Sequence, residues 1–259
     1  MEPENKEKNS MKVIIDSGAE IIGDAVIAAA VLLSPSPQAQ ITIAASRLFI
    51  VQGLRRAGEE VTKRWLGPRE KIRIGETITS IAQKAKENID KGKVYRKDWN
   101  DSAGTDGRTI RDEIIEGTLL IAQREYEERK IRFYGILTAN LGFKPDIDRA
   151  HATFLLRRAS QMSYRQLCLL AIFAQPEYAT RNEDYLNVEM DGSLEALLLE
   201  IRELHGNDIV NIGFAPSENI RGIRPHLIKT TIIGRELFEL MELWNIKSED
   251  FREVQKLLS

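Results

Sequence analysis

The segment from Ile110 to Gln175 constrains the fold more than any other part of the sequence. Apolar residues recur in it at three- and four-residue spacing along two adjacent rows: Ile110, Ile114, Gly117 and Ile121, and Ile115, Leu119, Ala122 and Tyr126. Two neighbouring rows at this spacing are typical of a helix with a wide buried face. The segment therefore predicts a mainly α protein whose core is a multi-helix bundle.

Composition sets further bounds on the class of protein. The chain has 259 residues, of which 42% are hydrophobic and 29% charged, and this balance suits a soluble protein that buries a core. The net charge of −2 indicates no particular partner. Cys168 is the one cysteine, so an internal disulfide is excluded, and its apolar neighbours favour a small core residue over a nucleophile. Residues 1–11 are charged and polar, which predicts a disordered tail rather than a signal peptide.

Residues 12–66 predict an apolar helical hairpin. The first apolar stretch runs from Lys12 to Leu33, the prolines within residues 34–38 interrupt it, and a second runs from Ile41 to Leu54. The first stretch carries three carboxylates at four-residue spacing, which places them on one helix stripe: Asp16, Glu20 and Asp24. Each would cost roughly 2.5–3.5 kcal/mol at the centre of a membrane span, so a lone transmembrane helix is disfavoured.

Three interpretations of this hairpin stay open. It is a core element packed within the chain, an element that inserts in a membrane when oligomerised, or an interface with another chain. A basic flank with a tryptophan follows the second apolar stretch and is typical of segments that meet a membrane surface. The candidate membrane or partner contacts are Asp16, Glu20, Asp24, Leu48, Phe49, Arg55, Arg56 and Trp65.

Residues 67–160 predict a helical core. Pro68 suits the first turn of a helix, and an apolar row follows it: Ile74, Ile78, Ile81, Ala85 and Ile89. The loop from Gly92 to Arg108 carries Tyr95 and Trp99, which either anchor the loop in the core or stack on a nucleobase. The charges within residues 124–130 predict a solvated surface turn.

Several polar residues predict helix starts. Asp146 or Asp148 suits an N-cap, and this role explains the two carboxylates near His151 without a metal ion. Ser163 and Gln166 form a capping box. Ser193 and Ser248 are expected to cap later helices.

Residues 161–259 predict a winged-helix-like module. Two β-branched runs, in residues 207–214 and 226–234, flank a loop with glycine and proline, and helices lie on either side. The candidate nucleic-acid contacts are Arg221, Arg224, Lys229 and Arg235. The preceding helix is rich in glutamate, so docking to a protein suits the module better than DNA reading.

Motifs for catalysis are absent from the sequence. It has no glycine-rich phosphate loop, no GxSxG and no HExxH, and its three histidines fall in different predicted elements. We therefore expect a non-enzymatic protein with no cofactor and no bound metal.

The central region resembles the bacterial abortive-infection alpha family of phage-defence proteins. The resemblance is carried by KIRFYGILTANLGF (Lys130–Phe143), by the stretch from Asp148 to Phe173, and by a T-x-x-G ending at Thr231–Gly234. It implies a role in bacterial defence through growth arrest or cell death, and it brings no catalytic residue to this chain.

Together these observations favour a cytoplasmic defence protein that oligomerises or binds a protein partner. A membrane-active version would use the hairpin peripherally at the inner membrane. The alternative is a cytosolic DNA-binding regulator that uses the C-terminal module.

Overall fold

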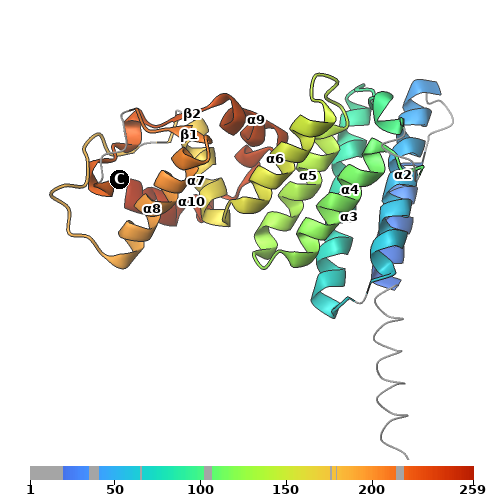
Figure 1. The fold of residues 1–259 in the computed structure, drawn as a ribbon, viewed down its shortest axis with the longest axis horizontal. Coiled ribbons are helices and arrows are strands. Elements are labelled where there is room, and N and C mark those ends of the chain that lie inside the picture. Colours follow the sequence, from blue (N-terminus) through green and yellow to red (C-terminus); the bar gives the residue numbers. More distant parts are fainter. Residues whose placement is uncertain are drawn as a thin grey trace, which may run out of the picture. The chain divides into compact units, whose positions relative to one another are not determined.

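Most of the described residues are helical in the computed structural model (Figure 1). The structure describes residues 20–34, 41–64, 66–101, 107–175, 177–178, 180–213 and 219–259. Within them a short two-stranded sheet near the C-terminus accompanies the helices, so the predicted mainly α fold class is confirmed. The chain divides into two compact units, residues 1–157 and residues 158–259, and each is described separately below.

The first unit is a bundle of helices. A helical segment over residues 20–32 precedes α2 (Ile41–Thr62), α3 (Pro68–Asp90), α4 (Ile110–Arg124), α5 (Ile131–Leu141) and the first part of α6 (Arg149–Gln161). Two short 3-10 turns, η1 (Asp98–Asn100) and η2 (Glu128–Lys130), lie between them. Helix α3 contacts α2, α4 and α5 and so forms the centre of the bundle (Figure 1).

The position of α3 follows from its sequence. Pro68 begins the helix, and the apolar row at Ile74, Ile78, Ile81, Ala85 and Ile89 is fully buried, as predicted. Each buried isoleucine stabilises the fold by about 1.5–3 kcal/mol relative to an exposed one. Helix α5 approaches α3 closely at Gly135, where a Cβ would lie 2.5 Å from the Cβ of Ser80.

Two predictions for the region after α4 are wrong. Tyr126 is 84% exposed rather than part of the buried row, because α4 ends at Arg124 and the helical spacing ends with it. The charges at 124–130 are not uniformly solvated. Lys130 Nζ lies 2.6 Å from Glu125 Oε2 in the interior, and the Tyr134 hydroxyl donates to the same carboxylate. A buried ion pair of this kind needs tertiary neighbours that no local pattern reveals.

The loop before α4 is anchored by its aromatic residues. Tyr95 and Trp99 are both buried, their ring centroids are 6.3 Å apart, and Tyr95 also stacks edge-on against Phe143. The core anchor predicted for Trp99 is therefore confirmed. Stacking of these two rings on a nucleobase is wrong, because neither face is accessible.

Local capping matches the sequence at some helix starts and not at others. Asp148 accepts a hydrogen bond of 2.7 Å from the amide of His151, and Ser163 with Gln166 forms the expected capping box. Helix α8, however, is capped by Asp191 rather than Ser193, and Ser248 is the first residue of α10 rather than its cap. At α8 the side chain of Asp191 accepts from the amide of Leu194, whereas the N-cap of α10 is Lys247, which makes no side-chain capping bond.

The second unit is built around α7 (Tyr164–Ala174), which contacts five other elements of the unit. Those elements are α8 (Gly192–Gly206), β2 (Lys229–Thr230), α9 (Ile232–Leu240), η5 (Leu243–Asn245) and α10 (Ser248–Leu258). Strand β1 (Val210–Asn211) pairs antiparallel with β2, with Val210 opposite Thr230, which confirms the predicted strand pair. The 3-10 turns η3 (Ile220–Gly222) and η4 (Pro225–Leu227) precede β2. Cys168 on α7 is buried, as expected for a core residue.

Candidate functional site

The N-terminal hairpin packs on the rest of the first unit through one side. Where the helical segment 20–32 crosses α2 and α3, a Cβ on Gly58 would lie 3.2 Å from Val26, and one on Gly75 would lie 3.3 Å from Ile21. Arg47 donates a hydrogen bond of 2.7 Å to the carbonyl of Ser34 at the other end. The two helices are therefore antiparallel, with Val26 level with Gly58 and Ser34 level with Arg47.

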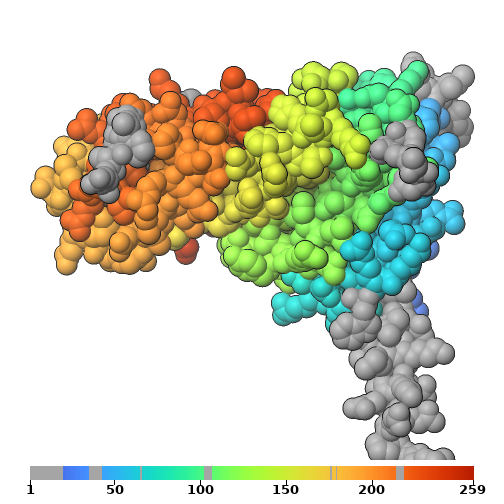
Figure 2. Space-filling view, in the orientation of Figure 1, coloured from blue at the N-terminus to red at the C-terminus, as the bar shows by residue number. Residues whose placement is uncertain are grey.

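The opposite side of the hairpin is exposed and carries apolar residues. Ile27 is 63% exposed, Val31 69% and Leu48 55%. At about 100° per residue, Glu20, Asp24, Ile27 and Val31 project within about 60° of one another, and Leu48 and Arg55 within about 20°. We call these six residues the outer face; α2, which contributes the last two, lies at the surface of the first unit (light blue, Figure 2).

The predicted contact residues of the hairpin lie in different surroundings. Glu20, Asp24, Leu48 and Arg55 are on the outer face, and Phe49 is half-buried beside it. Arg56 is exposed but turns toward α4, where it pairs with Asp112. Asp16 and Trp65 lie outside the described residues.

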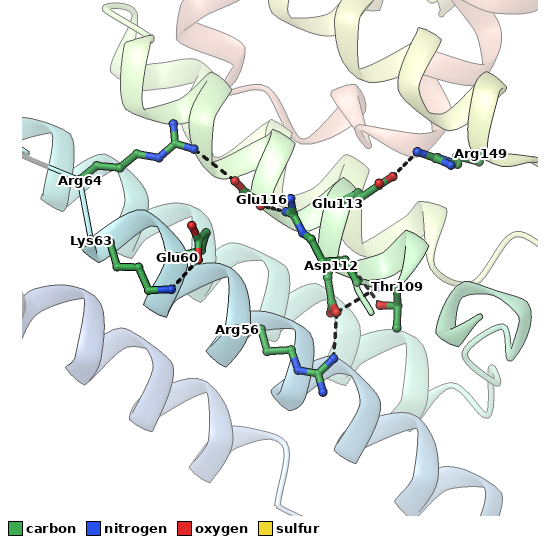
Figure 3. A network of polar contacts seen from close by, with 10 residues as sticks. Arg56, Glu60, Lys63, Arg64, Thr109, Asp112, Glu113, Glu116 and Arg149 are labelled. Carbon is green, nitrogen blue, oxygen red and sulfur yellow. Dashed lines mark hydrogen bonds and ion pairs between the residues drawn. The ribbon is translucent and has the colours of Figure 1, made fainter. Parts of the chain in front are cut away.

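A polar cavity of about 470 Å³ lies between α2 and the start of α4 (Figure 3). Close packing of the two helices positions it, since a Cβ on Gly53 would lie 2.7 Å from Arg111 Nε. The cavity is lined by Arg56, Ala57, Glu59, Glu60, Lys63, Gly107, Arg108, Asp112 and Glu116.

Asp112 is one of two buried carboxylates in the wall of this cavity. Its Oδ2 lies 3.0 Å from Arg56 Nη1 and accepts from the amide of Thr109, the N-cap of α4, while its Oδ1 lies 2.8 Å from Arg111 Nη2. Burial by itself raises the pKa of Asp112, but the hydrogen bonds and charge of Arg111 outweigh burial and hold this pKa below its usual value. Asp112 is therefore ionised at neutral pH.

Glu116 is the second buried carboxylate, one helical turn further along α4. It lies 3.3 Å from Arg64 Nη2 and also contacts Arg108 (Figure 3). At the rim, Lys63 pairs with Glu60 at 2.8 Å, and the hydrogen bond from Lys63 lowers the pKa of that carboxylate. The wall of the cavity is thus a set of ion pairs, in which the acids of α4 are buried and the pair at the rim is exposed.

The four predicted nucleic-acid contacts come from separate elements of the second unit. Arg221 is half-buried in η3 and Lys229 is exposed on β2. Arg224 lies 3.7 Å from Asp184, which offsets its charge. Arg235 on α9 donates a hydrogen bond of 3.2 Å to the carbonyl of Ala174. Two of the four cations are thus engaged within the unit.

The described residues hold neither a metal-binding cluster nor a helix that could cross a membrane. Across the described residues, no three His, Cys, Asp or Glu side chains are grouped so that they could hold a metal ion. No helix in the described part of the chain has both the length and the apolar character needed to cross a membrane. Comparisons with protein families, with curated proteins and with solved structures found no match to this chain.

Sequence reasoning missed the polar cavity. A partial signal was present, because Asp112 and Glu116 lie four residues apart on α4 and so share one face of that helix. Arg56 lies on one face of α2, and Arg64 follows two residues after the end of α2. The alignment of the two faces depends on the approach of α2 to α4 at Gly53, which the sequence pattern does not specify.

Proposed function

We propose that this chain is a non-enzymatic bacterial defence protein of the abortive-infection type, and that it acts through self-association of its N-terminal hairpin. The defence role is supported by the resemblance of residues 130–143 and 148–173. Most of these residues are buried in α5, α6 and α7, so they describe a scaffold. The outer face is where the working contact is proposed.

The observation that carries the proposal is the exposure of Ile27, Val31 and Leu48 on that face. Burying each of these side chains against a partner would stabilise a complex by about 1.5–3 kcal/mol before the costs of association. A group of large aliphatic residues on one face, rimmed by charges, is typical of an interaction site.

Charge complementarity supports a second copy of this chain as the occupant. A two-fold axis parallel to the hairpin would place segment 20–32 of each copy against α2 of the other. Arg55 precedes Gly58 by three residues and so is about level with Ala29, and its long side chain would extend toward Asp24 of the second copy, about one and a half turns away. Leu48 would likewise lie within a turn of Val31 of the second copy.

The existing partner of Arg55 does not oppose this arrangement. Arg55 Nε lies 3.0 Å from Glu59 on the same helix, and both side chains are exposed. Exposed pairs at this spacing are worth about 0.3–0.5 kcal/mol, so Arg55 can exchange Glu59 for a new carboxylate at little cost.

Two other occupants are less well supported. An anionic membrane would be repelled by Glu20 and Asp24, which lie on the same face as the apolar residues. The alternative of DNA binding by the second unit is weakened by the pairing of Arg224 with Asp184 and by the bond from Arg235 to α7.

The assembly is tested by size-exclusion chromatography with light scattering on the full chain. Wild type is expected to be a dimer, and Val31→Asp and Leu48→Asp are expected to be monomers with unchanged circular dichroism. Ile72→Asp is the matched control, because Ile72 is equally exposed but lies on α3. Asp24→Arg should weaken the dimer, and adding Arg55→Asp should restore it.

Several outcomes would contradict the proposal. These are a wild-type monomer at every concentration, equal loss of dimer in Ile72→Asp, and no rescue by the charge exchange. If wild type is a monomer and removal of residues 1–19 makes it dimerise, the occupant of the outer face is the chain's own N-terminal segment and not a second copy. A monomer that floats with phosphatidylglycerol vesicles, with flotation lost in Leu48→Asp, would assign it to a membrane.

The defence role needs a separate measurement. Cells that express wild type should release fewer phage and lose viability on infection, and Val31→Asp should behave as the empty vector. Equal phage yields from wild type and empty vector across a panel of phages would reject the defence role and leave the self-association unaffected.

A further inference from the structure

The polar cavity between α2 and α4 has no role in the self-association proposed for the hairpin. Its lining turns toward α4, whereas the outer face lies on the solvent side of α2. The two features can therefore be tested separately.

The buried carboxylates of the cavity are already paired with arginines. Asp112 accepts from Arg56, from both Nε and Nη2 of Arg111, and from the amide of Thr109. Glu116 lies between Arg64 and Arg108. A cationic ligand would have to displace arginines from these acids, and removing one partner of a buried ion pair costs about 3–5 kcal/mol.

The donors of the cavity are less fully used. A guanidinium carries five N–H groups, and Arg56 directs one of them to Asp112. The side chain of Arg56 is 58% exposed and that of Arg64 is 44% exposed, so both can turn further N–H groups toward the cavity. The side chain of Arg108 is also partly exposed beside Glu116.

Charge favours an anion in the same place. The lining itself holds three cations (Arg56, Lys63 and Arg108) and four carboxylates (Glu59, Glu60, Asp112 and Glu116). Arg64 and Arg111 pair with two of these acids from outside the lining, which brings the balance among these described residues to +1. The two carboxylates at the rim are paired with Arg55 and Lys63. The N-terminus of the 15-residue helix α4 opens beside Arg108 and adds its positive end.

We propose that this cavity binds a compact, water-soluble phosphate-bearing anion. Arg56 and Arg108 contact the phosphoryl oxygens, and Lys63 closes the rim. Guanidinium groups suit this role because their planar N–H groups bind phosphate in pairs. The volume of about 470 Å³ lies within the range of small-molecule sites.

The lining also limits the ligand. Ala57 and Gly107 are the uncharged residues among those that line it, and no aromatic ring is present there to stack on a base. A nucleoside would therefore add little binding energy beyond its phosphates. Pyrophosphate is expected to bind at least as tightly as AMP.

Calorimetric titration of the full chain with pyrophosphate at constant ionic strength tests the site. Wild type should bind one equivalent, and Arg56→Gln and Arg108→Gln should each weaken binding about tenfold, as expected when a charge-assisted pair is lost. Arg69→Gln is the matched control, because it removes the same charge from an exposed arginine of α3 that does not line the cavity. It should stay within about twofold of wild type.

Lys63→Gln is a second test variant that should not unfold the protein, because the side chain of Lys63 is exposed. It should keep the wild-type melting temperature and weaken pyrophosphate binding about threefold. No saturable heat with pyrophosphate or phosphate would overturn the proposal. Equal weakening by Arg69→Gln would do the same. So would saturable binding of spermidine alone, or flotation with anionic vesicles without any heat from pyrophosphate.

Discussion

Gly135 is the position where the packing of the first unit makes its sharpest prediction. A Cβ there would lie 2.5 Å from the Cβ of Ser80, 3.0 Å from the carbonyl oxygen of Thr77 and 3.1 Å from the amide nitrogen of Ile81. Two of these three atoms belong to the backbone of α3, so no side-chain rotation relieves the contact. Because carbon atoms pack best at about 3.5–4.0 Å, Gly135→Ala would have to push α5 about 1 Å from α3.

The expected cost follows from two opposing effects. Overpacking of a core costs about 1–3 kcal/mol, and the rigid backbone contacts place Gly135→Ala in the upper half of that range. Alanine in place of glycine within a helix recovers about 0.8–1.0 kcal/mol. We therefore expect the free energy of unfolding of the first unit to fall by about 1–2 kcal/mol.

Gly117 provides the matched control. It is also a glycine within a helix of the first unit, but a Cβ there would meet nothing within 4 Å. Gly117→Ala should therefore raise the free energy of unfolding by about 0.5–1 kcal/mol. Urea unfolding of the full-length variants, followed by far-UV circular dichroism, measures both changes. If Gly135→Ala proves as stable as Gly117→Ala, the close approach of α5 to α3 is wrong.

Three further predictions concern buried polar groups. Glu125→Gln removes the carboxylate 2.6 Å from buried Lys130 and leaves Glu127, at 3.9 Å, as a weaker partner. It should destabilise the first unit by about 3–5 kcal/mol in urea, and a loss below 1 kcal/mol would show that the pair is solvated. Burial alone would raise the pKa of Glu125, but the hydrogen bonds from Lys130 and Tyr134 outweigh burial and lower that pKa below its usual value of 4.5. The ionised form therefore stabilises the fold at neutral pH, and this contribution should disappear as the pH falls through the lowered pKa, in a wild-type stability profile that flattens in Glu125→Gln. Cys168 should react with a thiol reagent such as DTNB only as fast as the second unit opens, and immediate reaction under native conditions would contradict its burial.

The interior of the helices was predictable from local spacing. The row from Ile74 to Ile89 is buried because apolar side chains that share one face of a helix must be removed from water together. Pro68 and the Ser163–Gln166 box mark helix starts through contacts within four residues. The short strand pair follows from β-branched runs on either side of a loop.

The candidate sites were predictable only in part. The sequence placed apolar residues and charges on the hairpin, but whether Ile27 or Ile22 faces water depends on the surfaces of α2 and α3 against which the helix lies. Likewise, Asp112 and Glu116 on α4 have the sequence pattern of charged residues on a solvent-exposed helix face. Their burial beside Arg56 and Arg64 depends on an approach between helices about 50 residues apart in the chain.

By itself, then, the amino-acid sequence determined that this protein is helical, where most helices begin, and which residues of each helix avoid water, because these properties depend on neighbours within one or two turns. The tertiary structure alone decided that Gly135 tolerates no Cβ while Gly117 does, that Glu125 and Lys130 meet in the interior, and that a charged cavity opens between α2 and α4. Each of these depends on distances between segments remote in the chain, which close packing sets to within a fraction of an ångström and which no local pattern encodes.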